Sequence, residues 1–250
     1  MTRGLREHLA ERGVGRRDGF RFRGGEITRL EGFSDAVFAF AVTLLVVSLE
    51  VPRTYTELAA AMRGFFPFAV CFTALVMIWR EHYVFFRRYG LQDDATIWLN
   101  AALLFLVLFY VYPLKFLFTL VFVEVLGTAA PPRGGRALPM IDVPQIPWLF
   151  VIYGAGLIAI YGLLALLYVR ALRLRDRLEL TPLEVFDTRA SIVTHLLSAG
   201  IGGVSVLLAL TLPFHLVGLA GFSYFLFLPV MTVNGMISGS RRRRLEERLA

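Results

Sequence analysis

Four polar side chains in a mostly apolar chain have the types and spacing to form one hydrogen-bonded cluster. They are Arg29, Asp35, His82 and Asn100, and each lies near the end of a long apolar stretch. Polar groups in hydrocarbon are costly unless they pair, and charged partners strengthen each hydrogen bond. We therefore predict a structural clamp that joins three helices at one depth. A simpler interpretation is that Ser34 or Asp35 caps the start of a helix.

A second group of residues lies on one face of the first predicted helix. Phe40, Thr43, Leu44 and Val47 follow the spacing i, i+3, i+4, i+7, which places them on one side of a helix. Such a stripe in lipid is usually ordinary packing, because the whole helix is apolar. On pattern alone we leave open whether it packs against a neighbour or lines a pathway.

The composition requires a membrane setting for both groups. The chain has 250 residues, of which 57% are hydrophobic and only 18% charged, with a mean hydropathy of +0.65. A soluble globular domain carries about 25% charged residues. Cys71 is the only cysteine, which excludes an intrachain disulfide framework and a cysteine metal cluster. The sequence therefore predicts an all-α integral membrane protein.

Hydrophobic stretches of about 20 residues, the length needed to cross a bilayer, occur six times. The last two come from a run of 51 residues without charge, from Ala190 to Ser240, which Pro213 is expected to break. The predicted spans are 33–51, 64–86, 95–123, 147–169, 190–212 and 215–238.

The distribution of arginine predicts the topology, since positive residues are retained on the cytoplasmic side. With both termini inside, 21 arginines are cytoplasmic and four are in outer loops. We predict three regions: a mobile, Arg-rich cytoplasmic arm (1–32), a six-helix transmembrane domain (33–240) and a basic cytoplasmic tail (241–250). The basic residues flank spans and form no single recognition face, so we expect membrane lipids and no nucleic acid as partners.

Several functional classes lack support in the sequence. It contains no phosphate loop, zinc-protease motif or nucleophile elbow, so we expect no enzyme, and no cofactor or bound metal. His195 and Asn234 are weak candidates for a proton relay, since lone polar residues more often satisfy neighbouring helices. Gly154, Gly156 and the run from Gly200 to Gly203 are expected to allow close helix packing.

The first predicted helix closely resembles a known family signature. Arg29-x-x-x-Phe33-Ser34-Asp35, continued by the run from Ala36 to Val46, is similar to the motif of the transmembrane protein 175 family of potassium channels. Further likenesses are Trp79 with His82, and Leu99 with Asn100. The resemblance covers at least residues 29–105.

The resemblance implies a fold, an assembly and a pathway. Bacterial members are six-span subunits that form tetramers, in which four first helices line the pore. Their constriction is an aliphatic side chain five positions after the motif aspartate, followed three positions later by threonine. Here those positions are Phe40 and Thr43, so phenylalanine departs from the pattern and threonine fits it. Leu44 and Val47 would form further hydrophobic layers, typical of a pathway that conducts only when wetted.

We therefore predict a homotetrameric, potassium-permeable cation channel in a bacterial plasma membrane, with potassium present only in transit. We assign six residues to the structural polar cluster: Arg29, Phe33, Ser34, Asp35, His82 and Asn100. The main alternative is a secondary or proton-coupled transporter with Asp35, His82 or His195 as its titrating group. A membrane scaffold without transport is a second alternative.

Overall fold

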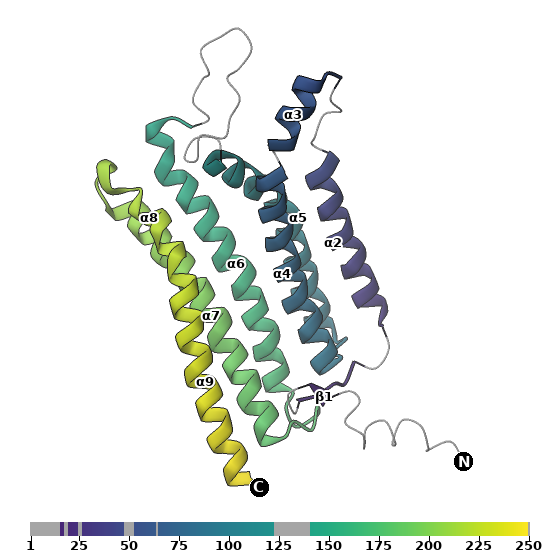
Figure 1. Cartoon of the computed structure of the whole chain (residues 1–250). Coiled ribbons are helices and arrows are strands. Elements are labelled where there is room, and N and C mark those ends of the chain that lie inside the picture. The colour runs from purple at the N-terminus through teal and green to yellow at the C-terminus, as the bar shows by residue number, and fades with distance from the viewer. Residues whose placement is uncertain are drawn as a thin grey trace.

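The computed structural model describes residues 16–17, 20–24, 27–47, 53–63, 65–122 and 141–249. Six helices of 19 residues or more dominate this part of the chain (Figure 1). They are α2 (Arg29–Val47), α4 (Phe65–Tyr89), α5 (Asp94–Leu120), α6 (Ile146–Arg173), α7 (Pro182–Thr211) and α9 (Phe227–Leu249). The shorter elements are β1 (Arg16–Arg17), β2 (Phe20–Arg21), α3 (Tyr55–Arg63), α8 (Leu219–Phe222) and the 3-10 turns Val143–Gln145, Phe214–Leu216 and Ser223–Leu226.

The long helices lie side by side in a bundle with two parts (Figure 1). In one part α5 packs against both α2 and α4, and α2 also contacts α4. In the other part α6 packs along α7, and α7 packs against α9. The contact between α5 and α6 joins the two parts. Their shared core includes Leu103 and Val107 of α5 and Leu164 and Leu167 of α6.

Five helical stretches in the described residues are long and apolar enough to cross a membrane: 65–89, 94–120, 143–173, 182–211 and 214–249. The chain is thus a multi-pass membrane protein. Helix α2 is not among the five. It carries Arg29, Glu31 and Asp35 in its first two turns, so its uncharged stretch is short. The count of six spans therefore stays a prediction.

The break at Pro213 is confirmed, but the helix after it does not begin where we expected. Helix α7 ends at Thr211, and two 3-10 turns and the four-residue α8 precede α9, which starts at Phe227 and not near residue 215. The hydroxyls of Ser205 and Ser223 both donate to the carbonyl of Ala220, at 3.0 and 2.7 Å. These side-chain hydrogen bonds stabilise a compact turn where we had expected a continuous helix.

The start of α2 also differs from the simpler interpretation of Ser34 and Asp35. The helix begins more than a turn earlier, and its cap is a reciprocal pair. The Thr28 hydroxyl accepts from the Glu31 amide at 3.1 Å, and the Glu31 carboxylate accepts from the Thr28 amide at 2.9 Å. This capping box frees Ser34 and Asp35 for contacts between helices.

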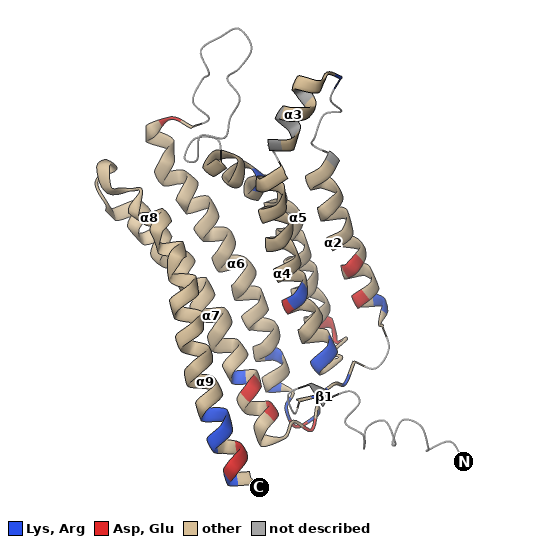
Figure 2. Cartoon of the chain, viewed as in Figure 1, with Lys and Arg blue, Asp and Glu red and all other residues tan. Residues whose placement is uncertain are grey.

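Charged residues gather at one end of the bundle (Figure 2), and residues 20–24 of the arm contact the helices there. The expectation of a mobile arm fails for residues 20–24. The ring of Phe20 is buried edge-on against Tyr89, and the guanidinium of Arg23 bonds both carboxylate oxygens of Glu184, at 2.7 and 3.2 Å. A buried aromatic ring and a bidentate ion pair anchor residues 20–24 to the helices.

Candidate functional site

Three buried polar side chains, one from each helix of the first part, form a hydrogen-bonded chain. The amide nitrogen of Asn100 donates to the hydroxyl oxygen of Ser34 at 2.9 Å, and that hydroxyl donates to the carbonyl of Leu30 at 2.8 Å. The amide oxygen of Asn100 lies 2.8 Å from Nε2 of His82. Since an amide oxygen only accepts, Nε2 of His82 carries the proton.

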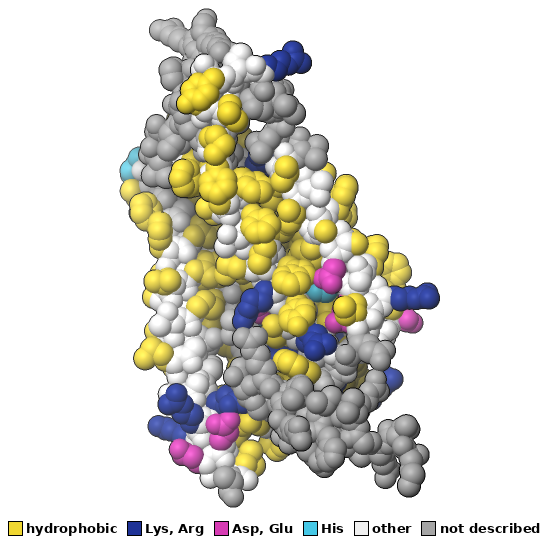
Figure 3. Space-filling model, turned by 45° about the vertical axis from the view of Figure 1, so that its right-hand side comes forward, with side chains coloured by type: hydrophobic (Ala, Val, Ile, Leu, Met, Phe, Trp, Pro, Cys, Tyr) yellow, Lys and Arg dark blue, Asp and Glu magenta, His cyan; other side chains and the backbone are white. Residues whose placement is uncertain are grey.

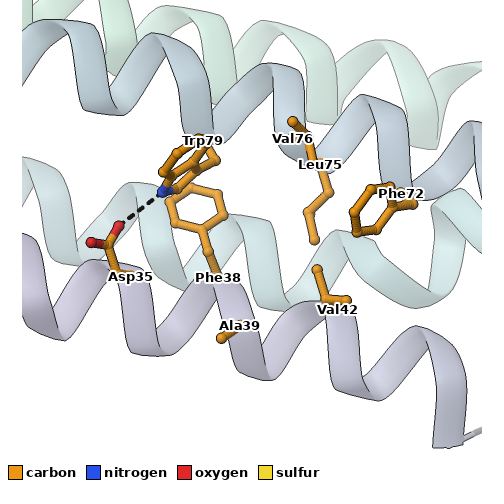
Figure 4. A pocket seen from close by; sticks show the side chains of 8 residues that line it. All are labelled: Asp35, Phe38, Ala39, Val42, Phe72, Leu75, Val76 and Trp79. Atoms are coloured by element: carbon orange, nitrogen blue, oxygen red, sulfur yellow. Dashed lines mark hydrogen bonds between the residues drawn. The ribbon is translucent and has the colours of Figure 1, made fainter.

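Asp35 lies outside this chain and bonds a different partner. The indole nitrogen of Trp79 donates to its carboxylate at 2.8 Å (Figure 4). The pair stands at one end of a groove of about 310 Å³ between α2 and α4, which Figure 4 shows from close by. The other lining residues are apolar: Phe38, Ala39, Val42, Phe72, Leu75 and Val76.

The structure thus brings together only part of the predicted cluster. Ser34, His82 and Asn100 meet, whereas Arg29, Phe33 and Asp35 are exposed on α2. Among the described residues, Arg29 makes no hydrogen bond to the cluster. The helical period explains the difference, because Ser34 shares the buried face of α2 with Phe38 and Asp35 is rotated by about 100° from it.

The predicted pathway residues lie mainly on the opposite side of α2. Phe38, Ala41 and Leu45 are buried against the bundle, while 56% of Phe40 is exposed and Thr43 is exposed as well. The Thr43 hydroxyl donates to the carbonyl of Ala39 at 2.9 Å. Because this bond uses the hydroxyl proton, the Thr43 oxygen can only accept from a further partner.

The other two predicted pathway residues are less well placed or not described. Leu44 is half-buried and packs against the core, so it lies at the edge of the exposed face. Val47 is the last residue of α2, and its side chain lies outside the described residues. Figure 3, which turns the α2 side forward, shows hydrophobic side chains over much of this face and most charged side chains below them.

An ion pair that the sequence did not reveal joins the start of α5 to the end of α6. Nε and Nη2 of Arg170 lie 3.1 and 2.8 Å from one carboxylate oxygen of Asp93, and Thr96 donates to the other at 2.7 Å. Burial alone would raise the pKa of Asp93, but the bonds from Thr96 and Arg170 outweigh it and lower the pKa below its ordinary value. From the sequence alone, Arg170 could be interpreted only as one of the arginines that predict the topology.

His195 is buried among aromatic rings of the second part. Its ring centroid lies 5.1 Å from that of Tyr168 and 6.0 Å from that of Tyr161, and neither ring nitrogen has a hydrogen-bond partner in the described residues. The side-chain amide of Asn234 donates to the hydroxyl of Thr194 at 2.8 Å and makes no hydrogen bond to His195 in the described residues. The two proposed relay residues therefore form no relay with each other. Within the described chain no group of His, Cys, Asp or Glu could hold a metal ion.

Comparisons with known proteins support the signature in the first helix. The model of the endosomal/lysosomal potassium channel TMEM175 family matches residues 29–110. A potassium channel of Marivirga tractuosa is 42% identical over 240 residues, which cover 93% of this chain and 96% of the relative.

Two solved structures share the fold. A crystal structure of a variant of the potassium channel MtTMEM175, bound to a nanobody fusion, matches 91% of this chain and 100% of its own at 40% identity with a TM-score of 0.78. A TMEM175 homologue from Chamaesiphon minutus matches 84% of this chain and 96% of its own at 22% identity with a TM-score of 0.53, which supports the fold alone. With almost its whole length aligned to one relative, the chain belongs to the TMEM175 family.

Proposed function

We propose that this chain is the subunit of a homotetrameric potassium channel in a bacterial plasma membrane. Its membership of a family whose relatives are named potassium channels carries the proposal of ion and activity. The mean hydropathy and the five apolar helices agree with a channel subunit in a membrane. We further propose α2 as a sixth span, since it lies alongside α4 and α5 (Figure 1).

The exposed face of α2 supports the proposed position of the pathway. Phe40 and Thr43 stand opposite the side chains that anchor α2 to the bundle. Four copies of this face around one axis would make a narrow ring of phenyl side chains followed by a ring of threonines. A ring of apolar side chains conducts only when water enters it, and a phenyl face attracts a cation.

The distribution of charge supports the proposed orientation. Charged residues gather at the end of the bundle where α4 and α6 end and α5 and α7 begin (Figure 2). We propose that this end, with both termini, faces the cytoplasm, because arginine-rich segments are retained there. The three regions 1–32, 33–240 and 241–250 are proposed on the same basis, although α9 runs through Arg241 to Leu249 as one helix.

Reconstitution into planar bilayers, with potassium and sodium on opposite sides, tests the proposed activity. We expect ohmic single-channel events and a reversal potential shifted toward that of potassium. Saturable, proton-dependent flux of a solute would instead favour a carrier, and absence of flux under every condition would favour a scaffold. Either result contradicts the proposal.

Matched substitutions test the pathway in the same recordings. Phe40→Ala should increase conductance or leak, because the four Phe40 side chains form the narrowest point of the proposed pathway. Phe109→Ala on α5 is the control, since that side chain is similarly exposed, at 59%. Thr43→Ala should change the ratio of potassium to sodium permeability, whereas Thr73→Ala on α4, also exposed and bonded to its own helix, should not. Unchanged currents in both α2 variants would show that Phe40 and Thr43 do not line the pathway.

A further inference from the structure

A second groove lies between the start of α5 and the end of α6, at the charged end of the bundle. Its volume is about 430 Å³, larger than that of the groove beside α2. One wall comes from the first turns of α5 and the other from the last turns of α6. Its lining residues are Ala95, Trp98, Leu99, Leu166, Val169, Arg170 and Arg173.

The groove combines an apolar floor with a basic rim. Leu166 and Val169 of α6 form the floor, and the indole of Trp98 on α5 lies opposite them with 76% of its surface exposed. Arg170 and Arg173 follow Leu166 along the same helix, at the end where charged residues gather. Tryptophan and arginine at such a level are typical of the boundary between acyl chains and headgroups.

The charges of the rim favour an anion. Nε and Nη2 of Arg170 bond the Asp93 carboxylate, and its Nη1 has no hydrogen-bond partner among the described residues. Arg173 is exposed and makes no ion pair among the described residues. Asp94 begins α5 nearby but is not part of the lining. The positive end of the α5 dipole points to the same place.

We propose that this groove binds an anionic phospholipid. The phosphate lies against Arg173 and Nη1 of Arg170, and one acyl chain runs along Leu166, Val169 and Trp98. The apolar floor selects a lipid over a free ion, and the net positive rim selects an anionic headgroup over a zwitterionic one. The site is separate from the α2 face, so the proposal does not depend on conduction.

Native mass spectrometry of the purified full chain in detergent tests the proposal by titration with phosphatidylglycerol, phosphatidylcholine or inorganic phosphate. We expect phosphatidylglycerol to bind at lower concentration than phosphatidylcholine and inorganic phosphate not to displace it. Equal binding of the two lipids, or displacement by inorganic phosphate, would overturn the assignment.

Two variants locate the bound lipid. Arg173→Gln should weaken phosphatidylglycerol binding about fivefold, the effect of one basic residue near a membrane surface. Arg177→Gln is the matched control, because it removes an exposed arginine from the turn after α6 without touching the groove. Leu166→Trp fills the floor of the groove and leaves its charges intact, so it should weaken the binding of both phosphatidylglycerol and phosphatidylcholine. Equal affinities of the arginine variants, or unchanged binding by Leu166→Trp, would exclude the groove as the site.

Discussion

The two parts of the bundle hold their helices together by different means. In the part made by α2, α4 and α5, buried polar side chains bond across all three helices through Asn100. In the part made by α6, α7 and α9, close backbone approach joins α6 to α7, and the buried His195 has no hydrogen-bond partner in the described residues. Apolar faces gain little from each other relative to lipid, so hydrogen bonds and small residues are the two available means of association.

Glycines of α6 and α7 make the close approach. A Cβ added at Gly154 would lie 2.7 Å from the carbonyl oxygen of Gly202 and would overlap Val206. A Cβ at Gly202 would in turn lie 2.8 Å from the carbonyl oxygen of Gly154. The contact is therefore reciprocal, and it involves backbone atoms that have little freedom to move away.

The largest expected effect breaks the glycine contact. Gly154→Leu should destabilise the protein by about 3 kcal/mol, because its side chain must displace the backbone of α7. Thermal unfolding in detergent, followed by circular dichroism, measures it. Gly162→Leu, on the same helix, is the control, since nothing lies within 4 Å of the added Cβ. If the two variants unfold at the same temperature, close packing does not hold the second part together.

The next effect breaks the polar chain. Asn100→Ala should cost about 2 kcal/mol, because it removes two hydrogen bonds and leaves the buried His82 without the hydrogen-bond partner that it has in the described residues. Chemical or thermal unfolding compares it with Asn234→Ala, which loses one half-buried bond to Thr194 and should cost less than about 1 kcal/mol. Equal losses would contradict the contrast between the two parts.

A smaller effect separates Asp35 from the polar chain. Trp79→Phe deletes the indole donor to Asp35 and should cost about 0.6 kcal/mol, the average for a hydrogen bond inside a membrane protein. Trp148→Phe, at an exposed position of α6, is the control. A loss as large as that of Asn100→Ala would mean that Asp35 belongs to the clamp after all.

The smallest effect tests the junction between the two parts. The pKa of Asp93 is lowered in the folded protein, so its ion pair with Arg170 stabilises the fold above the ordinary pKa of aspartate. That contribution, less than about 1 kcal/mol for a partly exposed pair, is lost as the pH falls through the lowered value, below about pH 4. Unfolding of Asp93→Asn against pH should lack this loss. A wild-type slope in the variant would assign the pH dependence to other groups.

Hydropathy and one proline predicted most of the membrane architecture, because long apolar stretches and the lack of a backbone donor act locally. The predicted stretches around α4, α5, α6 and α7 all correspond to helices. The turns before α9 could not be predicted, since they depend on bonds to Ala220 from two separate segments. The cap of α2 was readable from the Thr-x-x-Glu spacing of Thr28 and Glu31, which is a more specific capping signal than Ser34 or Asp35 alone.

The site was predicted by residue type better than by partner. His82, Asn100 and Ser34 meet, whereas Asp35, which the pattern also placed in the cluster, does not, because the rotation of α2 about its axis decides which side chain faces inward. The same limit applies to the glycines. Gly154 and Gly202 face each other, whereas a Cβ added at Gly200 or Gly203 would meet no atom of another element within 4 Å among the described residues. Sequence spacing places residues on a face but does not say what that face contacts.

The most direct test of the proposed pathway is block of the current by silver ions, which react with thiolates that water reaches. Thr43→Cys and Thr73→Cys, each in a Cys71→Ala background, place one thiol on the exposed face of α2 or of α4. We predict rapid block of the potassium current in the Thr43→Cys channel and none in the Thr73→Cys channel. An unblocked Thr43→Cys channel, or equal block of both, would contradict the assignment of α2 to the ion pathway.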